Sequence, residues 1–250
     1  MKAIILAAGS GTRLGKYTKD IPKCMLNFAG KTLIQCQFDV LLSVGIKDIV
    51  IVRGYHGEKV LVKGEARYIW NKDYADTNMV ESMMRVIENE ADGPCLVCYG
   101  DIIYEKRILD IILKNNSDIG CVVDDDWRDY WKLRFGDQQK DIESLVIGAD
   151  GNITELGEMD APLEKALVRY VGLVKFSKEG VKVVKDTYSS NKHFFKKAYM
   201  TDLLQIIISH GYKVFPIVIS RGWLEFDTEN DYEKMSLLYK KGELTKICNI

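Results

Sequence analysis

The first half of the sequence alternates between short apolar runs and longer amphipathic stretches. Residues 2–8, KAIILAA, are continuously apolar after Lys2, which is typical of a β-strand covered on both faces. Residues 32–45 carry apolar side chains at helical spacing, with Thr32 before the run and Gly45 after it. Such alternation predicts a parallel, doubly wound sheet. The same patterns predict strands at 48–52, 67–70, 95–101 and 119–126, and helices at 78–90 and 106–115. Asn78 and Glu81 have the spacing of a capping box at the start of the first of these helices.

The rhythm changes after about Asp124. Residues 144–157 form two short apolar stretches around Asp150-Gly151, which predicts a β-hairpin. Further strands are expected at 168–176, 212–219 and 223–228, with helices at 178–188, 199–211 and 229–241. We therefore predict one continuous domain, 1–250, in which an α/β half, 1–123, passes into a mixed α+β half, 124–250.

Composition excludes several classes of protein. The chain has 250 residues and a formal net charge of -1, so it offers no electrostatic basis for binding nucleic acid. No apolar run approaches the ~20 residues that a membrane span requires, and we expect no membrane partner. Cys95 and Cys98 lie three apart on a predicted strand and would point to opposite faces, which disfavours shared metal ligation. We expect reduced thiols in a cytoplasmic protein.

The turn after the first strand, Leu6 to Gly15, reads LAAGSGTRLG. It lacks the third glycine of a dinucleotide-binding turn, because Leu14 stands there, and no Gly-Lys-Ser/Thr of a P-loop follows. Small residues let backbone N–H groups turn toward an anion, and Arg13 adds a guanidinium for phosphate oxygens. A nucleoside triphosphate fits this turn better than a dinucleotide does; the alternative is an ordinary glycine-rich turn with a surface arginine.

The continuation places Pro22-Lys23 about ten residues after the turn. This combination resembles the nucleotidyltransferase family that joins nucleoside triphosphates to phosphorylated small molecules, whose pattern is L-A-A-G-x-G-[ST]-R-[LFM] followed by P-K. The segments YIWNKDYADTNMVESM, VCYGDII and GWLEFDTENDY extend the resemblance over most of the chain. The N-x-x-Y…N-x-x-x-S form and the short length are most similar to phosphocholine and phosphonate cytidylyltransferases. The resemblance implies a Rossmann-like, GT-A-like, mostly parallel mixed sheet with a small antiparallel substrate lobe.

The same resemblance implies roles for charged residues. Arg13 would bind the β- and γ-phosphates, and Lys23 would lie near the α-phosphate and the incoming phosphate. Asp101 ends a predicted strand, where open α/β sheets place their ligands, and Asp227 would face the same cleft. Two carboxylates together with phosphate oxygens and waters suit Mg²⁺. The alternative for each aspartate is capping of a turn.

For the nucleotide, the resemblance implies contacts from the turn and from the 78–90 helix. Asn78 could instead simply cap that helix. The full set of expected nucleotide-binding residues is Leu6, Ala7, Ala8, Gly9, Ser10, Gly11, Thr12, Asn78 and Ser82.

The acceptor pocket is expected in the second half, where DDDWRDYWKLRF combines carboxylates with aromatic faces that suit a cationic group. Trp131 loosely matches the family's choline-contacting tryptophan. Trp127, Tyr170 and Trp223 are candidate walls, and Glu225 is a candidate substrate residue. The alternative is an exposed acidic loop whose aromatics pack in the core or in the contact of a homodimer.

These features predict a Mg²⁺-dependent cytidylyltransferase. Its partners would be CTP and a small phosphorylated or phosphonate acceptor, such as phosphocholine, aminoethylphosphonate or an amino-acid phosphate, and pyrophosphate would be released. The resemblance implies that the product feeds decoration of cell-surface polysaccharides or lipids. Alternatives are a sugar-1-phosphate nucleotidyltransferase using dTTP, UTP or GTP, a non-catalytic nucleotide sensor, and an oxidoreductase.

Overall fold

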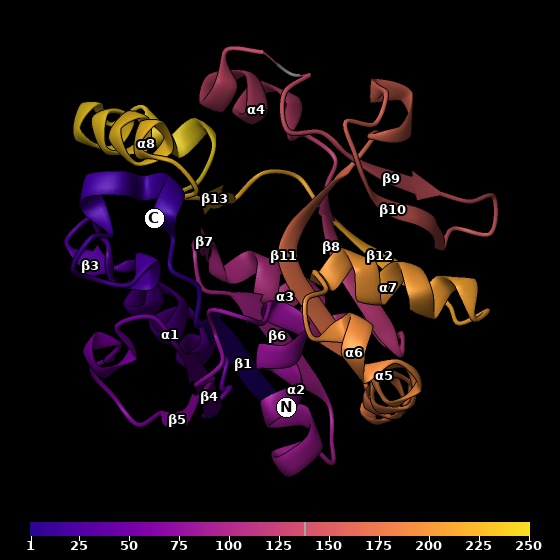
Figure 1. The fold of residues 1–250 in the computed structure, drawn as a ribbon. Coiled ribbons are helices and arrows are strands. Elements are labelled where there is room, and N and C mark those ends of the chain that lie inside the picture. Colours follow the sequence, from indigo (N-terminus) through magenta and orange to yellow (C-terminus); the bar gives the residue numbers. More distant parts are fainter. Residues whose placement is uncertain (138) are drawn as a thin grey trace.

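A seven-stranded β-sheet crosses the centre of the molecule (Figure 1). The computed structural model describes residues 1–137 and 139–250. The strand order is β12-β8-β11-β6-β1-β4-β5, and only β11 runs antiparallel to its neighbours. The predicted mostly parallel sheet is therefore confirmed. The strands are β1 (Lys2–Ala7), β4 (Asp48–Arg53), β5 (Arg67–Trp70), β6 (Cys95–Tyr99), β8 (Ile119–Asp124), β11 (Arg169–Phe176) and β12 (Phe215–Ile219).

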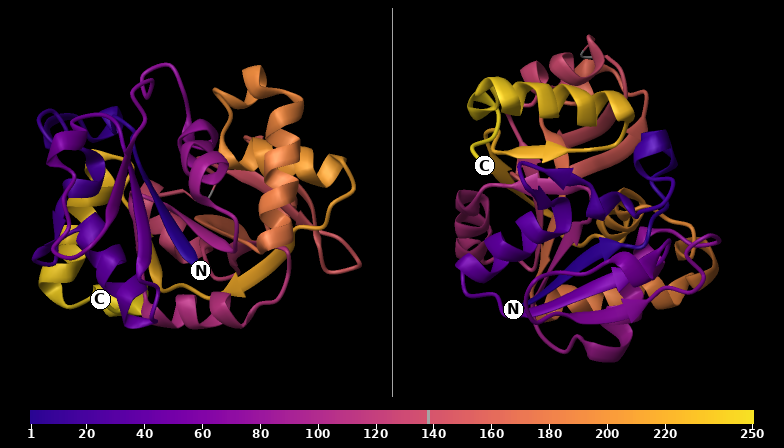
Figure 2. Two further views of the ribbon diagram at one scale, coloured as in Figure 1. Left: turned by 90° about the horizontal axis from the view of Figure 1, so that it is seen from below. Right: turned by 90° about the vertical axis from the view of Figure 1, so that its left-hand side faces the viewer.

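Helices cover both faces of this sheet, as Figure 2 shows. Alternate residues of β1 point to opposite faces: Ile5 belongs to one apolar cluster and Ile4 to the other. The first cluster is closed by α1 (Leu33–Ser43), α3 (Lys106–Lys114), α4 (Arg128–Phe135) and α8 (Glu229–Lys241). The second is closed by α2 (Met79–Glu90), α5 (Lys178–Ser190), α6 (Lys192–Phe195) and α7 (Met200–Ser209).

Three two-stranded antiparallel sheets complete the fold. The predicted hairpin around Asp150-Gly151 is present as β9 (Glu143–Ile147) and β10 (Ile153–Met159). The second sheet pairs β7 (Ile102–Tyr104) with β13 (Trp223–Glu225), and the third pairs β2 (Asn27–Phe28) with β3 (Lys31–Thr32). The β7–β13 pair matters most for the site, because it joins the segment after Asp101 to the segment before Asp227.

Two local expectations are wrong. Asn78 precedes α2, but its side chain accepts a hydrogen bond from Met79 N–H, and its own N–H donates to the Lys196 carbonyl. Glu81 instead accepts from the Tyr188 hydroxyl at 2.6 Å, so no capping box forms. The segment DDDWRDYWKLRF, read as a pocket wall or alternatively as an exposed acidic loop, contains helix α4, because Trp127, Tyr130 and Trp131 lie at helical spacing and turn inward.

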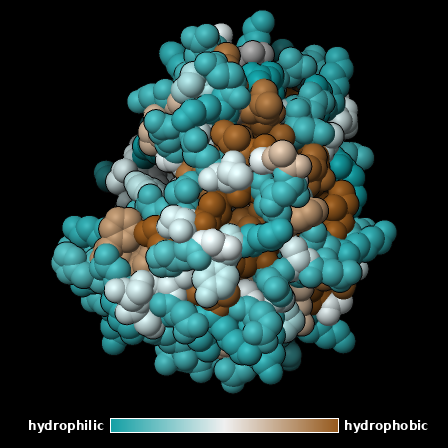
Figure 3. All heavy atoms as spheres, turned by 90° about the vertical axis from the view of Figure 1, so that its right-hand side faces the viewer, coloured by the Kyte–Doolittle hydropathy of each residue, from teal (hydrophilic) through white to brown (hydrophobic). Residues whose placement is uncertain are grey.

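Figure 3 shows one face of the molecule on which apolar residues gather among hydrophilic ones. The edge strand β12 also exposes apolar side chains, since Phe215 and Val218 are 42% and 44% exposed. Pro216 lies in this edge strand, where it limits pairing with another strand.

The homodimer and the cytoplasmic location stay predictions. Within residues 1–137 and 139–250, no helix combines the length and apolarity that a membrane crossing needs.

Candidate active site

A cavity of about 260 Å³ lies at the carboxyl end of β1. This is the edge at which open α/β sheets bind ligands. Of the residues predicted for the nucleotide, Ser10 does not line the cavity, whereas the others do: Leu6, Ala7, Ala8, Gly9, Gly11, Thr12, Asn78 and Ser82. In the part of the chain that the structure describes, the N–H groups of Gly9, Ser10 and Gly11 donate to no protein acceptor. These donors leave the turn ready to receive an anion.

Gly11 gives this turn its shape. Its φ of +61° lies in the left-handed region, and an added Cβ would stand 2.9 Å from Lys23 Cβ. The Gly11 carbonyl accepts hydrogen bonds from the Leu14 N–H and from the Thr18 hydroxyl, which closes the turn. The turn therefore holds the stem of Lys23 directly against its backbone.

We expect Gly11→Ala to destabilise the protein by about 1–2 kcal/mol, because alanine disfavours this φ, and to weaken nucleotide binding by displacing Lys23. Urea unfolding and CTP titration measure the two effects. Gly93→Ala is the matched control, since a Cβ there meets nothing within 4 Å. Unchanged CTP affinity in Gly11→Ala would contradict this account of the turn.

Two cations and two carboxylates meet on one wall of the cavity. The Lys23 ammonium bonds both Asp101 and Asp227, and Arg13 Nη2 lies 3.2 Å from Asp227 Oδ1. Burial lowers the pKa of Lys23, but the two carboxylates outweigh this effect and raise it above its ordinary value. Lys23 and Arg13 together hold the pKa of Asp227 below its ordinary value despite burial. Both shifts favour the charged forms of Lys23 and Asp227 at neutral pH.

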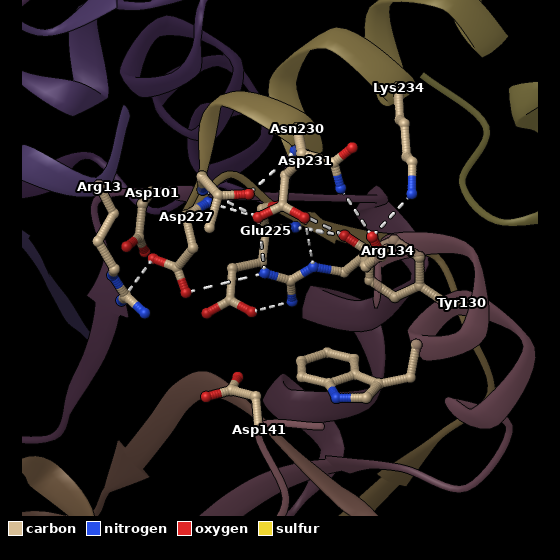
Figure 4. Close-up of polar contacts among 12 residues, drawn as sticks. Arg13, Asp101, Tyr130, Arg134, Asp141, Glu225, Asp227, Asn230, Asp231 and Lys234 are labelled. Carbon is tan, nitrogen blue, oxygen red and sulfur yellow. Dashed lines mark hydrogen bonds and ion pairs between the residues drawn. The ribbon is translucent and has the colours of Figure 1, made fainter. Parts of the chain in front are cut away.

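A buried arginine of α4, Arg134, lies beside Asp227 (Figure 4). Arg134 is fully buried; its Nε and Nη2 each donate to the Asp231 carboxylate at 3.0 Å, and its Nη1 bonds Glu225. Asp231 also accepts from Asp227 N–H at 3.2 Å and Thr228 N–H at 2.9 Å. Burial raises the pKa of Glu225 to about 8. Arg134 thus connects α4 to the segment that carries Asp227.

A second cavity, of about 660 Å³, adjoins the first. The two share Arg13, Asp101 and Asp227 in their walls. Most of the second cavity's lining comes from the second half of the chain and includes the expected Tyr170 and Glu225. A ligand in each cavity would therefore meet at the same cation–carboxylate cluster. Sequence reasoning missed several residues of this wall, which carry no family motif: Asp141, Glu143, Arg169, Tyr199 and Asp202.

The predicted tryptophan walls are not where the sequence placed them. Trp127, Trp131 and Trp223 are fully buried and line neither cavity. The Trp131 indole N–H donates to the Lys140 carbonyl at 2.9 Å, and that of Trp223 donates to Asp124 at 2.8 Å. These side chains form core, which corrects their expected role as pocket surface.

Asn78 and Ser82, both predicted to contact the nucleotide, differ in whether they have a hydrogen-bonding group free for a ligand. The Asn78 amide accepts from Met79 N–H at 2.8 Å and donates to the Lys197 carbonyl at 3.3 Å, so it serves the fold. Ser82 Oγ accepts from Asn71 at 2.9 Å, while its own hydroxyl proton has no acceptor among the residues described. Ser82 therefore has a donor available to a ligand in the first cavity.

Residues 3–191 match the MobA-like NTP transferase domain. The chain belongs to this family. It is a nucleotidyltransferase. A CTP:phosphoglutamine cytidylyltransferase of Campylobacter jejuni is 32% identical over 93% of this chain and 98% of its own length. A choline-phosphate cytidylyltransferase of Streptococcus pneumoniae is 28% identical over 96% of this chain and 99% of its own length.

Solved structures share the fold of this nucleotidyltransferase. That of the Streptococcus pneumoniae CTP:phosphocholine cytidylyltransferase has a TM-score of 0.72 at 23% identity and covers 95% of this chain and 98% of its own. A glucose-1-phosphate uridylyltransferase of Haloferax volcanii is 29% identical over 47% of this chain and 50% of its own length.

Proposed function

We propose that this protein transfers CMP from CTP to a small phosphorylated or phosphonate acceptor and releases pyrophosphate. The observation that carries the proposal is the meeting of two cavities at Arg13, Asp101 and Asp227. The first cavity would hold CTP and the second the acceptor. The full-length similarity to the two cytidylyltransferases supports cytosine as the base.

In this reaction an acceptor oxygen attacks the α-phosphorus of CTP. A new P–O bond forms as the bond to the bridging oxygen breaks, and pyrophosphate leaves. The demands are alignment of the two substrates and neutralisation of phosphate charge. Lys23 and Arg13 supply two positive charges at the boundary between the cavities, and the free N–H groups of the turn supply further donors.

The residues present fit a bound Mg²⁺. Asp101 Oδ1 is buried without a hydrogen-bond partner in the described part of the chain and belongs to a residue that lines both cavities. Together with Asp227 it gives the small number of protein oxygens that Mg²⁺ prefers. When bound, the ion would neutralise charge on the triphosphate.

Ser82 offers one hydrogen-bond donor to the base in the first cavity. Its free hydroxyl can donate to a carbonyl oxygen or an unprotonated ring nitrogen, and cytosine, uracil, thymine and guanine all offer such an acceptor. The sugar-1-phosphate alternative with UTP, dTTP or GTP therefore remains the second candidate, and the partial match to a uridylyltransferase favours testing it.

The test is pyrophosphate release measured with CTP, UTP, dTTP and GTP against phosphorylated amines, phosphorylated amino acids, an aminoalkylphosphonate and glucose-1-phosphate. We expect turnover with CTP and a small non-sugar acceptor. Turnover confined to a sugar-1-phosphate, or none with any pair, would overturn the proposal.

We expect Asp101→Asn to raise the Mg²⁺ concentration that gives half-maximal turnover by about tenfold or more, because one carboxylate ligand is lost. Pyrophosphate release as a function of Mg²⁺ concentration measures this, and EDTA should abolish turnover of the unmodified protein. Asp92→Asn is the control, since that side chain is fully exposed. Turnover that persists in EDTA would rule out the metal.

A further inference from the structure

Arg169 places a positive charge in the wall of the second cavity. It begins β11, and only 12% of its side chain is exposed. Its Nη1 donates to the Asp141 carbonyl at 2.7 Å, and its Nη2 lies 3.4 Å from Asp141 Oδ2. A guanidinium has five N–H donors, so these two contacts leave donors for an anionic ligand.

The same guanidinium covers the tryptophan expected to bind a cationic acceptor. Its central carbon lies 3.6 Å from the centroid of the Trp131 ring, and that of Arg134 lies 4.4 Å from it. A trimethylammonium group binds by resting on an open aromatic face. Here the guanidinium groups of Arg169 and Arg134 contact the Trp131 ring instead. The positive charge of Arg169 would also repel a choline-like trimethylammonium group.

The Glu143 carboxyl group lies in the same wall. Glu143 begins β9, and its carboxylate makes no hydrogen bond or ion pair with the residues that the structure describes. Burial raises the pKa of Glu143, while the nearby Arg169 lowers it. The neighbouring Asp202 differs, because its carboxylate accepts from Tyr199 N–H at 2.7 Å and caps α7. A half-buried carboxyl group that makes no hydrogen bond with the described residues has acceptors available to a cationic ligand group.

We infer that the acceptor is a phosphorylated or phosphonate amino acid, whose carboxylate binds Arg169 and whose ammonium binds Glu143. This inference rests on the proposed function, which places the acceptor's phosphorus at the other end of the second cavity, beside Arg13 and Asp101. Arg169 and Glu143 are then specificity residues: they bind the end of the acceptor that does not react.

A set of matched acceptors tests the inference with the full chain, CTP and Mg²⁺. O-phosphoserine and O-phosphohomoserine carry both groups at two chain lengths. O-phosphoethanolamine lacks the carboxylate, 3-phosphoglycerate has a hydroxyl in place of the ammonium, and phosphocholine has a trimethylammonium group without a carboxylate. We expect kcat/KM for the better phosphoamino acid to exceed that of each other acceptor by about tenfold or more.

The outcomes separate this inference from the proposed function. Equal or faster turnover of phosphocholine or phosphoethanolamine would overturn the amino-acid acceptor and leave the cytidylyltransferase intact. Turnover of a sugar-1-phosphate alone, or of no acceptor, would overturn both.

Variants give a second, independent readout. Arg169→Met should raise KM for the phosphoamino acid by about tenfold while leaving phosphoethanolamine unaffected, and Arg169→Lys should recover part of the loss. Glu143→Gln should raise KM for the amine-bearing acceptors but not for 3-phosphoglycerate. Arg128→Met is the control, because that guanidinium lies over Trp127, outside both cavities. An equal loss with every acceptor would mean a merely structural role and would refute the assignment.

Discussion

A Lys23→Met protein is expected to release pyrophosphate about 10²–10³-fold more slowly than the unmodified chain, the loss typical when one charged or hydrogen-bonding group at a developing charge is removed. Lys23 is the largely buried cation that contacts both Asp101 and Asp227 at the boundary of the two cavities. Its removal takes one positive charge away from the reacting phosphates and leaves Arg13 and the buried Arg134 as the arginines that contact Asp227. Single-turnover kinetics at saturating CTP measure the effect on the chemical step.

Two controls make this result specific. Lys19→Met removes an exposed lysine from the same loop and should leave turnover unchanged. Circular dichroism checks that Lys23→Met is folded, because the two carboxylates also lose a compensating charge. A rate within tenfold of the unmodified protein would show that Lys23 only balances the aspartates and does not act on phosphate.

The second large effect is expected at Arg134. Replacing it by methionine should lower the free energy of unfolding by about 3–5 kcal/mol, because the buried Asp231 carboxylate would lose its cation and Glu225 would lose a hydrogen-bond donor. Turnover should fall as well, since Asp231 holds the Asp227 N–H at 3.2 Å. Urea unfolding followed by tryptophan fluorescence measures the stability change.

A double-mutant cycle isolates the ion pair. Asp231→Asn combined with Arg134→Met should cost clearly less than the two single changes added together, because each single change leaves a charge unpaired. Lys132→Met is the control, an exposed cation on the same helix. A loss below about 1 kcal/mol in Arg134→Met would place this pair with weak surface ion pairs and contradict the network.

Local periodicity was enough to predict the sheet and most of its helices. The apolar run at 2–8 became β1, and Thr32 caps α1 as expected, because both features depend on neighbouring residues alone. The family resemblance located Arg13 and Lys23 through the turn motif and the P-K that follows it, and Asp101 and Asp227 through VCYGDII and GWLEFDTENDY; the structure brings the four together. Their predicted roles stay predictions until they are assayed.

Other parts depended on contacts between distant residues. Strand β13 lies within the strand predicted at 223–228, whereas the three-residue strand β7 was missed, because it is stabilised by pairing with the distant β13. Helix α4 could have been found, because Trp127, Tyr130, Trp131 and Arg134 follow the i, i+3, i+4, i+7 pattern of one buried face. The aspartates and arginines of DDDWRDYWKLRF also fit a solvated loop, which was the alternative interpretation of this segment.

The separation in sequence between Lys23 and Asp227 constrains when activity can arise during synthesis. Lys23 and Asp227 are 204 positions apart, and Asp227 is held by Asp231 on the last long helix. A nascent chain that ends before Asp227 would already contain the glycine turn and Arg13. It would lack Asp227, one of the two carboxylates of the site. We therefore expect incomplete chains still bound to the ribosome to be inactive and to consume no nucleotide.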